Sequence, residues 1–523
     1  MASPIGTIVR TDVRLRWRRT STIVTLLLMI VFAYVVVPDF RLGHTVMVVD
    51  GHRAVYNSTA LSLSTGLFAS FFLGLFGFYL VGNALRRDLE TGTGYIIAAT
   101  PIRNIEYLGG KLAGNIVFLG SIVAVYLVGV LAMHLLRGEA AIEPLTYLVT
   151  YLLLIVPSLV FAATFALAFE CLPLLAGRGG DILYLFIWIV VLSVAGVVLA
   201  GRQAEPGWGA IALDVFGMGT VLAELHRQGL GQGLGIGSTL FDPSLAPVVL
   251  QHIPVSLGLV TARLASAFLT APLFLLGLWS FHRFDPARVR SAAKQGGKGI
   301  LAQLGKLLKP LTRLLLPIAA WGGRSRWRFG GQIVSDAAVT FMLSPITLFA
   351  LVALSAWGFM APLDKLRGAV LPVTFFLLVL ALADIATRDR AVGAGPMLDG
   401  MPRLRSRRAL WKLASASLVA LLFTLVPMLR LLRSAPGSAA ALLVGTLFTA
   451  SLAVALGAIT GTPKTFAALF LFFLYLVLNG GALPGFDFAG WTGLATPSVT
   501  LGYFIATLVL AGGAMAWQRV ARD

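Results

Sequence analysis

Charged residues are scarce in this chain. Only 12% of its 523 residues are Asp, Glu, Lys or Arg, whereas 58% are hydrophobic and the mean hydropathy is +0.88. A soluble domain carries about 25% charged residues, so a water-soluble fold of this composition would lack polar side chains for its surface. The composition therefore predicts an integral membrane protein with many spans and not a single anchor.

Cysteine and nucleotide-binding motifs are nearly absent. The single Cys171 excludes an intrachain disulfide and a cysteine-rich metal site, and the six histidines form no H-E-x-x-H motif. The nearest approach to a phosphate loop runs from Gly457 to Thr465, but Pro463 stands before Lys464. We therefore expect no catalytic residue, metal or cofactor on this chain.

Twelve apolar runs are long enough to be predicted as helices that cross the membrane, each needing about 20 residues. They are 22–38, 61–85, 112–135, 146–169, 182–200, 262–281, 341–361, 369–387, 410–429, 438–460, 465–480 and 499–517. The segment 300–321 is also apolar, but cations lie between its leucines, so we expect it flat in the interface. The sequence thus predicts an all-α polytopic membrane protein.

Basic residues outnumber acidic ones, 41 to 22, and their placement predicts the orientation. With the N-terminus inside, 31 Lys and Arg fall in inner segments and 10 fall outside or at outer span ends. Cytoplasmic loops carry such an excess, so both termini are expected in the cytoplasm, and the net charge of +19 needs no nucleic acid. The five arginines before the first span lack a following cleavage site, which predicts a retained span.

Two long loops resemble each other. At an offset of 301 residues, 86–112 and 387–413 share seven identities in 27 ungapped positions. Each loop lies between the second and third spans of a six-span half. We therefore expect two parallel six-span halves, 1–290 and 325–523, joined by a basic interfacial linker, 291–324. The identical pairs are Arg87/Arg388, Asp88/Asp389, Gly92/Gly393, Gly94/Gly395, Pro101/Pro402, Lys111/Lys412 and Leu112/Leu413.

The first loop has the pattern of a short helix held below two spans. Gly92 and Gly94 interrupt the helix of the second span, residues 95–99 can form an apolar-faced helix, and Pro101 ends it. A helix held this way suits docking to a cytosolic partner. The alternative is an ordinary amphipathic inner loop.

The run RRDLETGTGYIIAATPIRNIEYLGGKL resembles the corresponding loop of type-2 ABC transporter permeases. The resemblance lies in Glu90 with Gly92, in 99–102 (ATPI), and in Tyr107 with 110–111 (GK). An amphipathic elbow helix at 4–20 is similar to that of the family, with Ile5, Val9, Val13 and Trp17 opposite Arg10, Arg14 and Arg18. A long outer insert, 201–261, with a helix expected at 211–227, fits as well.

The resemblance implies an exporter subunit in the bacterial inner membrane. Two separate ATPase subunits would bind ATP and magnesium and contact the loops 86–111 and 387–412; further membrane or periplasmic subunits are left open. The docking residues implied are Asp88, Glu90, Gly92, Tyr95, Pro101, Arg103, Asp389, Arg390, Pro402 and Arg403. The second loop departs from the pattern, with Arg390 near the position of Glu90 and with extra arginines. We therefore expect the two loops to contact their ATPase subunits unequally.

Two other classes of protein remain open. A twelve-span secondary carrier of the major facilitator type shares the two-half layout, and Asp389-Arg390 partly imitates its loop motif. Against it, Asp384 is the one acid within the predicted spans, which is few for ion coupling. A non-transporting membrane scaffold is the third reading. The apolar interior favours an amphipathic or lipid-like cargo over a highly charged one.

Overall fold

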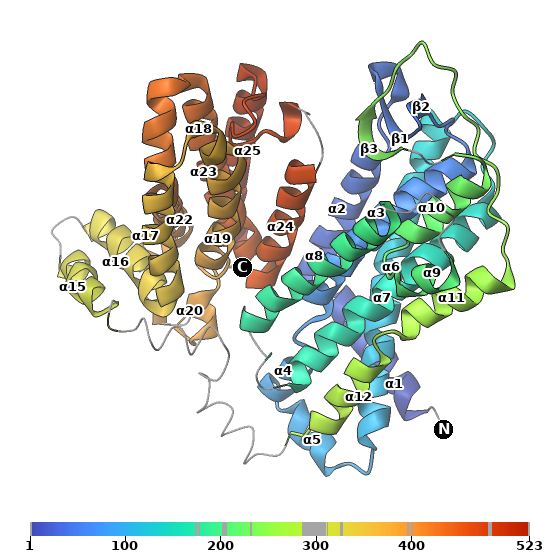
Figure 1. The fold of residues 1–523 in the computed structure, drawn as a ribbon. Coiled ribbons are helices and arrows are strands. Elements are labelled where there is room, and N and C mark those ends of the chain that lie inside the picture. The colour runs from blue at the N-terminus through green and yellow to red at the C-terminus, as the bar shows by residue number, and fades with distance from the viewer. Residues whose placement is uncertain are drawn as a thin grey trace. The chain divides into compact units, whose positions relative to one another are not determined.

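The chain forms two compact units, Met1–Gly299 and Ile300–Asp523 (Figure 1). The computed structural model describes residues 3–172, 175, 178–200, 207–230, 233–284, 310, 312–324, 328–394, 397, 398, 400, 402–479 and 484–520. Most of the predicted linker 291–324 therefore lies outside the described residues.

Unit 1 is built around α3, a helix that is apolar on all sides and buried along almost its whole length. The helices of this unit are α1 Pro4–Trp17, α2 Thr20–Val36, α3 Ser58–Val81, α4 Ala84–Glu90, α5 Thr93–Ala99, α6 Asn104–Arg137, α7 Pro144–Cys171, α8 Arg178–Ala200, α9 Trp208–Leu213, α10 Met218–Arg227, α11 Leu257–Phe268 and α12 Ala271–Ser280, with a 3₁₀ turn η1 Phe40–Leu42. Helix α7 packs along α3, and Gly66 lets the two approach, since a Cβ there would lie 3.2 Å from Leu154.

The first helix meets the second at an angle of 76°. Arg19 has extended backbone angles at this corner. The Arg16 carbonyl at the end of α1 accepts hydrogen bonds from the Arg19 backbone N–H at 3.0 Å and from the Thr22 hydroxyl at 2.6 Å. Helix α1 then lies beside α6, where Gly110 admits the Ile8 side chain. The expected elbow segment 4–20 is thus a helix followed by a sharp corner.

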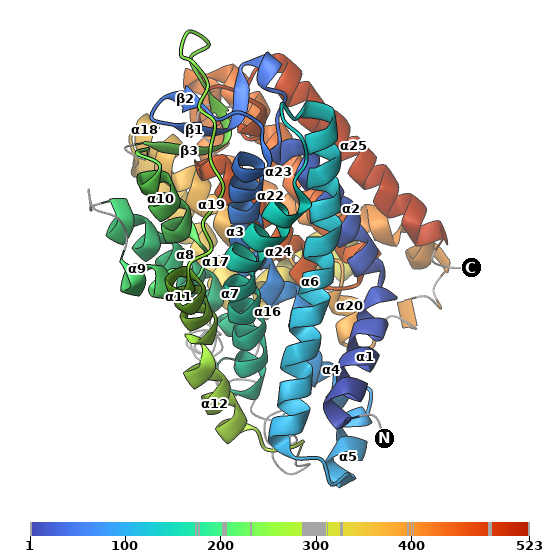
Figure 2. The same cartoon turned by 90° about the vertical axis from the view of Figure 1, so that its right-hand side faces the viewer.

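A three-stranded antiparallel sheet, which the sequence analysis did not predict, closes one end of unit 1. Its order is β2-β1-β3, with β1 His44–Val49, β2 His52–Arg53 and β3 Leu234–Leu240. Asp50 and Gly51 both have positive φ, as a two-residue hairpin turn requires. In Figures 1 and 2 the sheet lies at the end of unit 1 opposite α5.

The expected helix at 211–227 is two helices, α9 and α10. The chain breaks at Asp214, whose carboxylate accepts hydrogen bonds from the backbone N–H groups of Gly217 and Gly219, with Gly217 at φ +92°. Arg263 of α11 lies 4.0 Å from this carboxylate, and both side chains are buried. The hydrogen-bonded turn at Asp214 and the ion pair between Asp214 and Arg263 together hold the insert against α11.

Unit 2 has a similar succession of elements. They are the 3₁₀ turn η2 Arg313–Leu315, α15 Leu316–Arg324, α16 Arg328–Leu343, α17 Pro345–Met360, α18 Leu363–Lys365, the π-helical turn η3 Leu366–Val370, α19 Leu371–Leu382, α20 Arg388–Ala391, α22 Pro402–Ser434, α23 Pro436–Thr460, α24 Pro463–Asn479, the 3₁₀ turn η4 Pro484–Phe486 and α25 Pro497–Val520. Helices α16 and α17 meet at 99°, with Pro345 opening the second helix.

The prediction of a mainly helical, multi-pass membrane protein is confirmed. Among the described residues, eight helices are long and apolar enough to cross a membrane, or ten when each bent pair is counted as one span. Three shorter apolar helices occupy Leu183–Ser193, Arg313–Gly322 and Pro463–Tyr475. The number twelve stays a prediction.

Candidate functional site: two ion-pair clusters and the short helices beside them

A buried ion-pair cluster joins α1, α4 and α6 in unit 1. Asp12 of α1 accepts hydrogen bonds at 2.9 Å from both Arg87 Nη2 and Lys111 Nζ. Lys111 Nζ also lies 2.7 Å from Asp88 Oδ2, and the Tyr107 hydroxyl donates to the same oxygen at 2.6 Å. Asp12, Asp88 and Lys111 are each 5% exposed or less. Two carboxylates and two cations thus neutralise one another out of water, as buried charges require.

Arg16 extends the cluster one turn along α1. Its Nη2 donates to Asn115 Oδ1 at 2.6 Å and to the Val81 carbonyl at 3.3 Å, and it lies 3.9 Å from Asp12. The Val81 carbonyl is at the end of α3, where the helix leaves its last carbonyls unpaired. One arginine therefore ties the elbow helix to the end of α3 and to the interior of α6.

Unit 2 contains a cluster of the same residue types on the corresponding elements. Asp336 of α16 accepts from Arg388 Nη2 at 2.5 Å and from Lys412 Nζ at 3.0 Å. Lys412 Nζ also lies 3.0 Å from Asp389 Oδ2, and Arg408 Nη2 lies 3.5 Å from that oxygen. The offset of 301 that aligns the loops places Arg408 at the position of Tyr107, and each residue binds the acid of its own loop.

Within the described part of unit 2, the cluster has no counterpart of Arg16. An offset of 324 pairs Asp12 with Asp336 and Arg16 with Thr340. Arg388 donates to Thr340 Oγ1 at 2.7 Å. Alanine occupies position 416, where the loop offset of 301 would place the partner of Asn115. Both members of the Arg16–Asn115 pair are thus replaced together in unit 2.

Helices α4 and α5 are held to the rest of unit 1 by a side-chain cap and an apolar core. The Glu170 carboxylate of α7 accepts from the backbone N–H groups of Ala84 at 3.0 Å and Leu85 at 2.7 Å, the unpaired donors that begin α4. Gly92 has φ +75° and turns the chain into α5. Gly94 packs on Phe284, and a larger residue would not fit easily, because a Cβ at position 94 would lie only 3.1 Å from the Phe284 ring. The same core contains Leu85, Tyr107, Leu108, Leu167 and Cys171.

The other side of α5 exposes apolar side chains. Tyr95 is 47% exposed and Ile96 is 69% exposed, and Pro101 and Arg103, just beyond the helix, are exposed as well. Arg283 donates to the Thr100 carbonyl, which ties the chain after α12 to the end of α5. The result is an anchored helix whose outer face has unburied apolar surface, a common feature of interaction sites.

The structure divides the sequence-predicted residues of the first loop into two groups. Asp88 is buried in the ion-pair cluster, whereas Tyr95, Pro101 and Arg103 lie at the surface. Gly92 forms the turn between them, and the side chain of Glu90 lies outside the described part of the structure.

In the second loop, Asp389 belongs to the ion-pair cluster and Arg390 is exposed. Pro402 opens α22, while the Arg403 side chain and residues 395 and 396 lie outside the described residues. Val392 and Met397 are 77% and 68% exposed. An exposed apolar pair therefore occurs in this loop too.

Sequence reasoning missed the two aspartates that organise the clusters. Asp12 was read only as part of the elbow segment 4–20, and Asp336 was not singled out at all, although each is the single acid in a long basic stretch. Glu170 was missed as well, and it is likewise an acid at the end of an apolar run. A lone acid among arginines is a signal for a buried ion pair.

No protein-family model, no curated protein and no solved structure matches this chain. Within the described residues, no group of three or more His, Cys, Asp or Glu side chains is placed to hold a metal ion.

Proposed function

We propose that this chain is the membrane component of an ATP-driven exporter, and that separate ATPase subunits bind to its two cluster-bearing loops. The observation that carries the proposal is α5, a short helix with Tyr95 and Ile96 exposed, whose preceding helix is fastened to α1 and α6 by buried ion pairs. An apolar aromatic at the centre of a small interface is a common binding anchor.

The clusters give the helix pair the stiffness that transmission of force needs. A movement imposed on α5 passes to α4 across the two-residue connection Thr91–Gly92, and then through Asp88 and Arg87 to Lys111 and Asp12. Buried pairs hold one geometry because separating them exposes charge to a low dielectric, at a cost of several kcal/mol. Closure of the ATPases, which hold ATP and magnesium, would thereby tilt the spans that begin at α1 and α6.

The repeated pattern supports a duplicated architecture. Each cluster uses an acid on the helix before a sharp corner, an Arg-Asp pair in the loop and a lysine on the following long helix. In this proposal each half has six spans, and α8 and α24 are two of the twelve. Both termini and both loops lie in the cytoplasm of a bacterial cell, at its inner membrane.

The test is ATP hydrolysis by the chain reconstituted with proteins that contain a phosphate loop and are encoded by neighbouring genes. We expect no hydrolysis by the chain alone, and stimulated hydrolysis by the pair. Tyr95→Ala combined with Ile96→Ala should weaken assembly about tenfold or more, because both remove buried interface area. Leu42→Ala is the matched control, since Leu42 is 78% exposed near the sheet at the opposite end of unit 1. Hydrolysis by the isolated chain, or equal losses in both variants, would contradict the proposal.

A further inference from the structure

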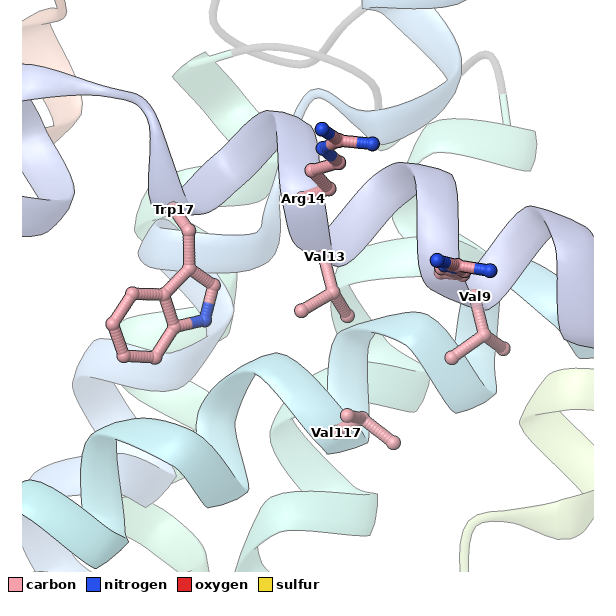
Figure 3. A pocket seen from close by; sticks show the side chains of 6 residues that line it. Val9, Val13, Arg14, Trp17 and Val117 are labelled. Atoms are coloured by element: carbon pink, nitrogen blue, oxygen red, sulfur yellow. The ribbon is translucent and has the colours of Figure 1, made fainter.

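A shallow hollow on unit 1 lies where α1 crosses α6. Figure 3 shows Val9, Val13 and Trp17 extending from α1 toward the side on which Val117 rises from α6, while Arg14 leaves the helix on another side. The complete lining is Val9, Arg10, Val13, Arg14, Trp17 and Val117. The floor is therefore apolar and the rim is cationic.

The helical repeat explains why the two kinds of side chain adjoin. Residues four apart share a face of a helix, so α1 presents three parallel rows. One row packs toward α6 and the cluster, the next lines the hollow, and the third carries the exposed arginines. The rows are Ile8, Asp12 and Arg16; Val9, Val13 and Trp17; and Arg10 and Arg14.

The arginines of the rim are free to bind an anion. Neither Arg10 nor Arg14 makes a hydrogen bond or ion pair with the described part of the chain, and both are exposed. The one acid of α1, Asp12, is buried and bonded to Arg87 and Lys111. The exposed face of α1 is consequently positive without any compensating carboxylate.

We propose that this hollow binds an anionic glycerophospholipid. The phosphate pairs with Arg10 and Arg14, and the upper part of an acyl chain lies against Val13, Trp17 and Val117. Amphipathic helices with basic and aromatic residues associate with anionic lipid in this way, and tryptophan prefers the membrane interface. The proposal does not depend on an ATPase partner.

The first test measures which lipid stays bound. The chain is reconstituted in nanodiscs of phosphatidylcholine with a minority of phosphatidylglycerol, released, and its lipid adducts are compared by native mass spectrometry. Arg10→Gln with Arg14→Gln should lower the preference for phosphatidylglycerol about thirtyfold, since each of the two arginines near a lipid surface contributes about 1 kcal/mol. Arg41→Gln with Arg227→Gln removes the same charge from exposed sites of unit 1 outside α1 and α6 and should leave the preference unchanged. If the two double variants show the same preference for phosphatidylglycerol, the proposal is overturned.

The second test distinguishes a lipid from a free anion. Val117→Trp fills the hollow, whereas Val128→Trp adds the same bulk at an exposed position farther along α6. We expect the bound lipid to be lost in the first variant and kept in the second. Displacement of phosphatidylglycerol by inorganic phosphate, without an effect of Val117→Trp, would show an anion site and refute the lipid site.

Discussion

At the residue scale, Lys111 is the side chain that joins both carboxylates of the first cluster. Replacing it by methionine keeps the length but removes the cation that contacts both Asp12 and Asp88, and leaves Arg87 and the more distant Arg16 to neutralise them. Breaking a buried pair in this way costs about 3–5 kcal/mol. We therefore expect Lys111→Met to lower the melting temperature of the detergent-solubilised protein strongly.

Two variants control this experiment. Lys365→Met changes an exposed lysine and should leave the melting temperature nearly unaltered. Adding Asp88→Asn to Lys111→Met removes one of the two carboxylates and should recover part of the loss. If the melting temperature of Lys111→Met equals that of Lys365→Met, the cluster does not stabilise the fold.

Glu139 predicts a pH dependence at the end of unit 1 that carries the sheet. Burial by itself raises the pKa of this carboxyl, but hydrogen bonds from Arg53 and from the Tyr56 backbone N–H outweigh it, so the pKa is lowered. A carboxyl with a lowered pKa stabilises the fold above its unfolded-state pKa, and the contribution is lost as pH falls through the folded-state value. The melting temperature should therefore fall in acid more steeply for the wild type than for Glu139→Gln. If the melting temperatures of the two proteins change with pH in parallel, the hydrogen bonds to Glu139 contribute nothing to stability.

At the scale of elements, Arg263 compensates for a proline inside α7. Pro157 has no N–H, so the Leu153 carbonyl one turn earlier lacks its helical partner. Arg263 Nε donates to that carbonyl at 2.8 Å and so joins α11 to α7. The proline in α7 and the buried arginine of α11 are thus parts of one arrangement.

The two residues should show coupled effects on stability. Arg263→Met leaves the Leu153 carbonyl and Asp214 without this partner, and we expect a loss of about 3–5 kcal/mol. In a Pro157→Ala background the restored N–H can bond Leu153, so the same change should cost less, by about 1 kcal/mol. Thermal melts of the four proteins in this double-mutant cycle measure the coupling. If the two substitutions change stability by strictly additive amounts, the coupling between Arg263 and Pro157 is refuted.

The sequence predicted local elements better than those formed by distant segments. The α4–α5 turn followed from Gly92, and the end of α5 followed from Pro101, because such backbone preferences act over a few residues. The sheet was missed because β1 pairs with β3 almost two hundred residues later. The break between α9 and α10 depends on the carboxylate of Asp214, which the helical pattern of its apolar neighbours concealed.

The candidate site was predicted in part for the same reason. Tyr95 was expected among the docking residues on a short helix, and it is exposed there. Asp88 was grouped with the docking residues from its place in the loop, yet its carboxylate faces Lys111 and Tyr107. Such a partnership requires α1, α4 and α6 to pack together, and the spacing within one loop cannot reveal it.

At the scale of the whole molecule, the orientation across the membrane can be tested with two matched cysteines. Cys171 is buried and is removed as Cys171→Ser, after which Ala99→Cys and Ala246→Cys introduce single exposed thiols at opposite ends of unit 1. The excess of basic residues predicts that an impermeant reagent labels position 246 from outside intact cells, and position 99 only after lysis. The reverse pattern would invert the topology, and labelling of both positions from outside would contradict a spanning fold.

The most direct test of the central claim asks what touches Tyr95. A photo-crosslinking amino acid is placed there in the full chain, expressed with its genomic neighbours, and a second protein carries it at Leu42 as the control. The account predicts that irradiation joins Tyr95, and not Leu42, to a protein that contains a phosphate loop, as identified by mass spectrometry of the adduct. Absence of that adduct at Tyr95, or an equal yield at Leu42, would contradict the assignment of α5 as the ATPase-binding helix.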